Sequence, residues 1–471
     1  MRETQQAIAA ARRLVLWPIA MGVVGMLITL VMVLALVALG RLPPEPISAN
    51  LRISIEEGSL IGADWAGFDR VRGHNQYNDC LIIMMTRFQR DPVESAIAPL
   101  VIFNDYPRPL LDGASQLITE CDVAIAAIRS DRPLHVYPPE FYEPYQRYVF
   151  GFRIPFQTLI SFTTIGTIRI LYRTAGVALL LFLIVGHCVR AVRNWRRNDR
   201  AKAIAGTSYV VLGSGLALFS GLDIYGQSLS HAPSDILLFA ALCWLSFGKP
   251  MAGLRGDLTA ATLAALAFAF EFLHGTLPMM LAIILGTLAL NAFALRHELR
   301  ILDLVRATAA FVLGVVGSAI TKLATVIWLM GVPSAQQYLG QLSYRMSGAS
   351  LSVADAFTAL WNHAFFIGWG AGWLIKPVLL GACLATCGAA IAILRLSGWR
   401  LMAALTALAS SGVIFGWYVV FHSHTAIHAT FMVRILAWPI GMSVVCLLLA
   451  LWPDDHRTAT ERRFWPGRQP T

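Results

Sequence analysis

Ten apolar stretches divide the chain, and polar or charged connections separate them. The first stretch, residues 14–40, has no charged residue in 27 positions, whereas roughly 20 apolar residues suffice to cross a bilayer. The pattern therefore predicts an all-α polytopic membrane protein with about ten transmembrane helices. The other nine stretches cover residues 174–189, 208–225, 236–247, 258–274, 277–295, 307–330, 375–394, 401–421 and 435–452.

Arginine and lysine gather in alternate connections between these stretches. Residues 190–202 hold six basic residues and one acidic residue, and the connections at 296–306 and 395–400 are also basic. The connections at 227–235 and 275–276 contain neither Arg nor Lys. Because cytoplasmic loops of membrane proteins carry excess positive charge, the pattern places both termini in the cytoplasm.

This topology divides the chain into four parts. Residues 1–40 form a cytoplasmic N-terminus and the first transmembrane helix, and residues 453–471 form a cytoplasmic tail. Residues 174–452 form a bundle of about nine helices. Residues 41–173 form a large first extracytoplasmic loop, whose 13 Arg and 15 acidic residues indicate a balanced, folded domain. Within it, two interrupted apolar segments predict amphipathic helices on the membrane surface; they are residues 101–104 and 156–170.

Composition excludes two classes of protein. With 57% apolar residues, 14% charged residues and a mean hydropathy of +0.62, the chain is too hydrophobic for a water-soluble protein of this length. The net charge of +10 does not indicate nucleic-acid binding, because the basic residues lie beside the apolar stretches, where they orient helices. The common sequence motifs of soluble enzymes are also missing. Chemistry is therefore expected at the outer ends of the helices.

Asp79 is the first candidate catalytic residue. It directly precedes the apolar run at 81–85, and a carboxylate at the start of a helix is stabilised by the helix dipole. Such a group can deprotonate an acceptor hydroxyl, or it can simply cap the helix. The loop's two cysteines, Cys80 and Cys121, can form a disulfide in an oxidising compartment, or remain free.

Other carboxylates of the loop compete with Asp79. Asp64 and Asp69 lie five residues apart, and Glu56 and Glu57 are adjacent. Their spacing matches no established metal-binding signature, so we predict no metal site and no certain cofactor, and a divalent metal requirement stays open.

A cationic constellation precedes the last apolar stretch. His424 and His428 are four residues apart and share a face of a helix, with His422 before them and Arg434 after them. Arg345, in an earlier outer connection, adds a second guanidinium. Guanidinium and imidazole groups at a membrane surface suit the phosphate of an anionic headgroup. Zinc binding and structural histidines are the alternatives.

Ionisable groups inside apolar stretches are costly and therefore also candidates. Glu271 and His274 are three residues apart and can pair near the outer end of a helix. Lys322 lies near the middle of a stretch and is expected to pair with an acid or to contact lipid phosphate. His187, near the inner side, is the histidine that an acyltransferase would use.

The chain resembles the GT-C class of membrane glycosyltransferases, which use polyprenyl-phosphate sugars as donors. The class typically places a catalytic acid in the first outer loop, and Asp79 is the matching position. The segment Tyr145-Gln-Arg-Tyr148 with Gly151 and Arg153, the pair Ile168-Arg169, and residues 422–434 are similar to segments of multispanning proteins encoded among bacterial polysaccharide genes. The chain lacks the closely spaced acids that many members of the class carry.

The resemblance implies an enzyme of the bacterial inner membrane with a periplasmic active site. The expected reaction transfers a sugar from a polyprenyl-phosphate donor to a cell-envelope glycan, lipid or protein acceptor. Asp79 would act as the general base, His424, His428 and Arg434 would bind the donor phosphate, and Arg345 would assist. The alternatives are a polysaccharide polymerase or ligase, a transporter or flippase of lipid-linked saccharide, and an acyltransferase.

Overall fold

The structure is a computed structural model that describes residues 2–61, 76–87, 91–101, 120–130, 143–271, 275–348, 350–364 and 375–451. Over these residues the fold is all-α, apart from one pair of two-residue strands. The predicted fold class is therefore confirmed. Asp64, Asp69 and His274 lie outside the described residues.

Ten helices coincide with the ten predicted apolar stretches. Eight spans of the described residues are long and apolar enough to cross a membrane; the last of them, 429–451, joins three consecutive short elements. Helices α9 and α10 complete the set with 16 and 17 residues. The ten are α1 (Arg2–Leu39), α7 (Ile165–Arg196), α8 (Arg200–Phe219), α9 (Ala232–Phe247), α10 (Gly253–Ala269), α11 (Thr276–Leu295), α12 (Ile301–Met330), α15 (Ile375–Ile393), α16 (Gly398–Val420) and α19 (Ala437–Leu451).

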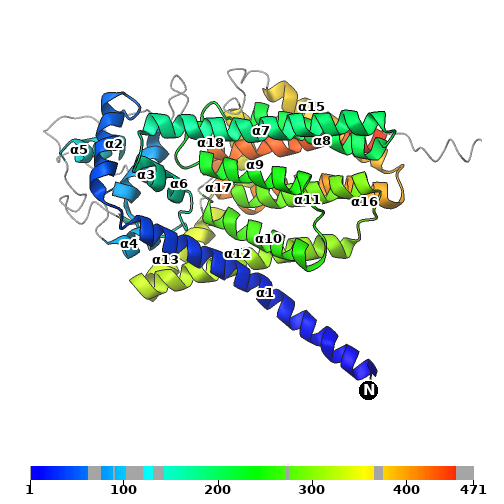
Figure 1. Cartoon of the computed structure of the whole chain (residues 1–471), viewed down its shortest axis with the longest axis horizontal. Coiled ribbons are helices and arrows are strands. Elements are labelled where there is room, and N and C mark those ends of the chain that lie inside the picture. Colours follow the sequence, from blue (N-terminus) through cyan, green and yellow to red (C-terminus); the bar gives the residue numbers. More distant parts are fainter. Residues whose placement is uncertain are drawn as a thin grey trace, which may run out of the picture.

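The long helices lie side by side in a bundle, and the helices of the first loop gather at one of its ends (Figure 1). We call this the loop end and the other the opposite end. Helix α1 crosses α12 so closely that a Cβ on Gly25 would collide with the backbone of Gly314. A Cβ on Gly317 would likewise collide with the backbone of Gly22. Small residues at such crossings let two membrane helices approach closely.

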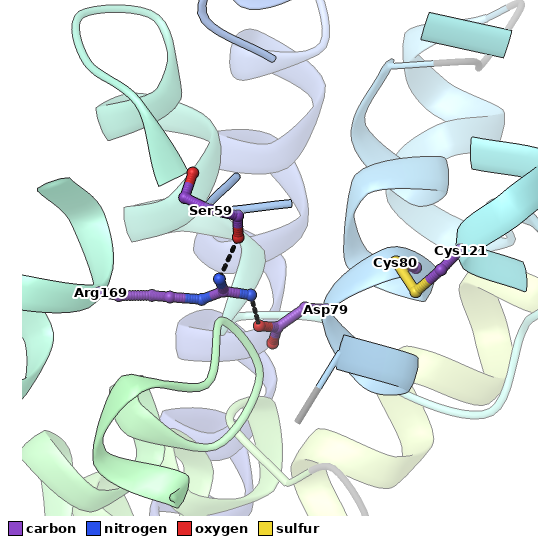
Figure 2. Close-up of a disulfide and its surroundings, with 5 residues drawn as sticks. All are labelled: Ser59, Asp79, Cys80, Cys121 and Arg169. Carbon is purple, nitrogen blue, oxygen red and sulfur yellow. Dashed lines mark hydrogen bonds and ion pairs between the residues drawn. A yellow bond between two sulfur atoms is a disulfide. The ribbon is translucent and has the colours of Figure 1, made fainter. Parts of the chain in front are cut away.

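The loop between α1 and α7 forms a compact layer on the bundle. Its elements are α2 (Pro44–Glu56), α3 (Gln76–Arg87), α4 (Pro92–Ile97), β1 (Leu100–Val101), α5 (Glu120–Ser130), β2 (Glu143–Pro144) and α6 (Arg153–Ile160). Strand β1 pairs antiparallel with β2. A disulfide between Cys80 and Cys121 joins α3 to α5, with the two Cα atoms 5.1 Å apart (Figure 2). The hydrophobic core of this layer continues into the bundle through Leu229 and Val326.

The structure describes only parts of the two segments predicted as surface amphipathic helices. Val101 belongs to β1 rather than to a helix, and the residues that follow it lie outside the described ones. Helix α6 buries Phe156 and Ile160 completely, because these two positions face α2, α3 and the start of α7 in one shared core. Residues 161–164 connect α6 to α7, and residues 165–170 belong to the start of α7.

Two buried cations hold the loop layer in place: Lys322 ties it to the bundle, and Arg153 joins α6 to α4 within the layer. Lys322 of α12 donates from Nζ to the carbonyl of Ile97 at 2.6 Å, so its predicted partners, an acid or a lipid phosphate, are replaced by the end of α4. Arg153 donates from Nη1 to the carbonyl of Ser95 at 2.6 Å. Both cations lie near the Phe150 ring, 5.8 and 5.3 Å from its centroid. The backbone of Phe150 has φ of +63°, a conformation that bulky residues adopt only when their surroundings enforce it.

Seven short elements complete the loop end. Helix α14 contacts α17 and α18, and the turn η5 contacts α17, so residues 344–348 and 353–363 pack against the segment 422–432. The seven are the 3-10 turn η4 (Tyr225–Gln227), α13 (Val332–Ser343), the π-helical turn η5 (Tyr344–Gly348), α14 (Val353–His363), α17 (His422–Ile427), α18 (Ala429–Met432) and the 3-10 turn η8 (Val433–Leu436).

Candidate functional site

Asp79 lies in the first turn of α3 and is completely buried. Its Oδ2 accepts from Nη2 of Arg169 at 2.6 Å, and its Oδ1 accepts from the hydroxyl of Ser228 at 3.1 Å and from the amide of Leu229 at 2.7 Å. Arg169 also donates to the carbonyl of Ser59 (Figure 2). Burial raises the pKa of Asp79, and the Arg169 guanidinium opposes that rise.

This geometry makes Asp79 an anchor between three parts of the chain. It joins α3 to α7 and to the turn before α9, and both carboxylate oxygens are engaged by donors. It stands inside the helix and not at the capping position. A general base must reach the hydroxyl that it deprotonates, so the catalytic role of Asp79 stays a prediction that requires one of these donors to move.

Arg434 also takes part in a buried ion pair. It lies in η8 with 4% of its surface exposed, and its Nη2 contacts both carboxylate oxygens of Asp235 in α9. Its Nε donates to the carbonyl of Ser220 at 3.1 Å, and its guanidinium stacks 4.3 Å from the ring of Tyr225. Asp235 thus compensates its charge. Among the described residues, no direct contact joins Arg434 to His424 or His428, with which we expected it to act.

His424, His428 and Arg345 do come together at the loop end. The two imidazole rings are 4.8 Å apart, and Nη1 of Arg345 contacts Nε2 of His428. Burial lowers the pKa of His428 to about 2, assisted by His424, Arg345 and Arg147. His428 is therefore neutral and accepts a hydrogen bond from Arg345. His422 points elsewhere, with Nδ1 3.1 Å from the carbonyl of Val419.

Arg147 and Tyr148 belong to the same cluster. Burial raises the pKa of the Tyr148 hydroxyl well above its usual value, and the positive charges of Arg345 and Arg147 oppose this rise. Since both guanidinium groups act on Tyr148 and on His428, they lie on the same small region. Gln146 fixes the segment to α13 by donating to Gln337 at 3.1 Å. The sequence had singled out Tyr145–Tyr148 for its resemblance only; an arginine with a tyrosine on either side within two residues was the available signal.

A chain of side-chain contacts leads from Asn78, the neighbour of Asp79 in sequence, toward this cluster. Asn78 contacts His231 through their side-chain nitrogens at 3.1 Å, and the His231 ring stacks on Phe431 at 5.0 Å. Phe431 in turn lies 6.1 Å from His428. Sequence analysis noted the connection at 227–235 only for its lack of Arg and Lys. Its run of Ser, His and Asp residues directly before an apolar helix was the signal for these buried polar contacts.

Two of the other candidates, Glu271 and His187, have contacts that stabilise the fold. Glu271 accepts from the amides of Gly275 at 2.9 Å and Leu277 at 3.0 Å, and so caps the start of α11. His187 is buried between the rings of Tyr209 and Phe247, 4.4 and 4.2 Å away. In the part of the chain that the structure describes, no three His, Cys, Asp or Glu residues are placed to hold a metal ion.

Comparison of the chain with protein-family models, with characterised proteins and with solved structures finds no match. The function is therefore argued from the geometry of the site alone.

Proposed function

We propose that this multispanning membrane protein is a glycosyltransferase of the GT-C type. It would transfer a sugar from a polyprenyl-phosphate donor to a cell-envelope glycan, lipid or protein acceptor at the loop end. The observation that carries the proposal is the convergence of Arg147 and Arg345 on Tyr148 and neutral His428.

Phosphate is the chemistry that this cluster suits best. Arg345 is half-buried, and no carboxylate of the described residues forms an ion pair with it. His428 accepts a hydrogen bond from one N–H group of Arg345, and the other N–H groups of Arg345 remain for a ligand. A guanidinium group binds phosphate through two parallel hydrogen bonds, and such charge-assisted bonds are about twice as strong as neutral ones.

The surroundings of Arg345 suit a lipid-linked donor. Helix α13 precedes Arg345 and exposes three large apolar side chains, with 56% of Val332, 50% of Leu339 and 46% of Leu342 accessible. Helix α14 exposes Trp361 by 46%. An amphipathic segment of this kind lies at the boundary between headgroups and acyl chains. It would place the Arg345 guanidinium at the depth of a lipid phosphate.

Two carboxylates are candidates for the general base. Asp79 is the one indicated by the resemblance, and its use requires release from Arg169 or from residues 228–229. Glu271 is the other, because its charge reaches Tyr148 of the cationic cluster. Either carboxylate would accept the proton of the acceptor hydroxyl while the sugar leaves its phosphate.

The disulfide supports the proposed location of the site. Disulfides persist in oxidising compartments such as the periplasm, and the bond between Cys80 and Cys121 lies in the loop layer. The distribution of Arg and Lys predicts the same orientation. Both arguments favour an inner-membrane protein with cytoplasmic termini and a periplasmic site.

The test measures transfer of labelled sugar from polyprenyl-phosphate donors into acceptors of native membranes. Wild-type protein is compared with Arg345→Gln, Glu271→Gln and Asp79→Asn at equal amounts of folded protein. The control is Arg129→Gln, which removes an exposed arginine from α5 in the same loop layer. We expect transfer by the wild type and the control, and a loss of at least about tenfold in Arg345→Gln, from about 1.5–3 kcal/mol per charge-assisted bond.

Loss of transfer in only one of the two carboxylate variants would identify the base. Equal transfer by Arg345→Gln and the wild type would contradict the phosphate site. A wild type that moves lipid-linked saccharide across vesicles without transferring sugar would favour the flippase. A polymerase or ligase would retain transfer when both carboxylates are replaced, because it uses the same carrier without necessarily needing a carboxylate base.

A further inference from the structure

A cavity of about 270 Å³ opens at the opposite end of the bundle. The start of α10, the end of α11, the turn at 296–299 and the start of α12 surround it. Small-molecule sites usually enclose about 300–1,000 Å³, so this cavity has room for a headgroup but not for an oligosaccharide. It lies at the other end of the bundle from the cationic cluster and is independent of the proposed function.

Two ion pairs line the cavity. Nη2 of Arg306 lies 2.5 Å from Oδ2 of Asp257, and the indole of Trp17 donates to the same oxygen at 2.8 Å. At the mouth, Arg300 donates from Nε and Nη2 to Asp303 at 3.2 and 3.1 Å. The lining therefore carries two positive and two negative charges.

Asp257 and Arg306 each keep hydrogen-bonding groups that their ion pair does not use. Both donors of Asp257 use Oδ2, and among the described residues no hydrogen bond engages its Oδ1. Arg306 uses only one nitrogen in the described contacts, and 40% of its side chain is exposed. The cavity thus presents an unused carboxylate oxygen beside unused guanidinium N–H groups.

This combination discriminates between kinds of ligand. A simple anion would gain from Arg306 but would be repelled by Asp257 and Asp303. A simple cation would gain from Asp257 and Asp303 but would be repelled by Arg306. A ligand with a phosphate and an ammonium group a few bonds apart can engage Arg306 and Asp257 together, leaving both ion pairs intact. Such matching matters most where water is largely excluded.

The depth of the cavity matches the headgroup region of a bilayer. Leu288, Ala292 and Leu295 provide apolar lining from the last two turns of α11. Trp195 and Trp244, at the same end of their helices, are 57% and 50% exposed, and exposed tryptophans mark the interface between membrane and water. A ligand held here keeps its polar group among the charges and its apolar part toward the lipid.

We propose that this cavity binds a phosphoethanolamine group, with phosphate on Arg306 and ammonium on Oδ1 of Asp257. The source that the position favours is phosphatidylethanolamine from the leaflet at the opposite end. Basic pockets between membrane helices bind anionic headgroups, and the carboxylate of Asp257 adds a partner for an ammonium group here.

The experiment is native mass spectrometry of the full-length protein, delipidated in detergent and titrated with single lipids. The probes are phosphatidylethanolamine, phosphatidylglycerol and soluble phosphoethanolamine. The main variant, Ala252→Trp, places a bulky side chain at an exposed position of the lining, and Ala390→Trp, on an exposed face of α15, is the control. Arg306→Gln and Asp257→Asn test the two contacts.

We expect phosphatidylethanolamine to bind about tenfold more tightly than phosphatidylglycerol, a difference of about 1.4 kcal/mol. Ala252→Trp should lose the preference and Ala390→Trp should keep it. Soluble phosphoethanolamine that binds as tightly, with the same sensitivity to Ala252→Trp, would support the headgroup site and assign it to a soluble ligand. Equal binding of both lipids, or a preference unchanged in Ala252→Trp, would overturn the proposal. If Arg306→Gln or Asp257→Asn does not fold, Ala252→Trp alone decides.

Discussion

The loop end contains two kinds of charged group. Asp79 with Arg169 and Asp235 with Arg434 are buried ion pairs in which each charge has its partner. Arg345, in contrast, is half-buried and is held by a neutral histidine. The two kinds lie only a few side chains apart, connected through His231 and Phe431.

The two kinds of charged group are suited to different roles: the buried ion pairs stabilise the fold, and Arg345 is available to bind a ligand. Removing two charges from water is expensive, and their attraction repays that cost only when the geometry is satisfied within the protein. Such a pair has little left to offer a substrate. A cation held by a neutral group keeps its full charge and most of its donors. Arg345 is therefore the charged residue at this end that is best placed to bind a ligand, although Asp79 and Arg434 are more deeply buried.

The largest expected effect comes from breaking a buried pair. Asp79→Asn leaves the Arg169 guanidinium without its carboxylate in a buried site, and should lower the free energy of unfolding by roughly 3–5 kcal/mol. The measurement is thermal unfolding of purified protein in detergent, followed by intrinsic fluorescence. Arg169→Met together with Asp79→Leu should recover most of the loss, because replacing a whole buried pair with apolar groups is often neutral.

A catalytic Asp79 would add a second effect. Asp79→Asn, compared with the wild type at equal amounts of folded protein, would then lose sugar transfer. That outcome would show that the donors around the carboxylate move during turnover, and it would end the division between the two kinds of group.

The disulfide provides the second test of the anchoring side. Replacing Cys80 and Cys121 with serine removes a cross-link between positions 41 residues apart, which the chain-entropy model values at about 4 kcal/mol. Unfolding of the double variant should therefore begin at a lower temperature. Cys383→Ser, at an exposed free cysteine of α15, is the control. A melting curve identical to that of the wild type would mean that the loop layer is held by its packing alone.

The length of the apolar stretches predicted the helices because lipid imposes one requirement on every span. It did not predict the ion pairs, because Asp235 and Arg434 lie 199 positions apart and only the folded chain brings them together. His424 and His428 were recognised from their spacing within one segment, whereas Arg345 and Arg147 joined them through tertiary packing. The packing of α6 against protein was not predicted, because Phe156 and Ile160 look the same in sequence whether lipid or protein covers them.

A smaller effect should separate Arg345 from Arg434. Arg345→Gln breaks no ion pair among the described residues, so the free energy of unfolding should change by less than about 1 kcal/mol. Arg434→Gln leaves Asp235 buried without its counter-ion and should cost roughly 3–5 kcal/mol. Affinity for a short-chain polyprenyl phosphate, measured by calorimetry, should fall about 10- to 100-fold in Arg345→Gln. A large loss of stability in Arg345→Gln would place it with the anchoring residues.

The smallest effect is a pH dependence that originates at His428. Its pKa is about 2 in the folded protein against an ordinary value of 6.5, so below pH 6.5 the unfolded chain binds a proton that the folded protein does not. Stability from this group is therefore complete above about pH 6.5 and declines as the pH falls toward the folded pKa. Between pH 7 and pH 5.5 the loss should be about 1 kcal/mol.

His428→Gln removes this titration, and the difference in melting temperature between pH 7 and pH 5.5 should then be smaller than in the wild type. His424, Arg345 and Arg147 remain in the variant, so only the imidazole of His428 is tested. An unchanged pH dependence would mean that His428 keeps its ordinary pKa in the folded protein and becomes protonated beside Arg345 as the pH falls. The cluster would then hold two adjacent positive charges, and its affinity for phosphate should rise as the pH falls, whereas a neutral His428 predicts an affinity that is constant over this range.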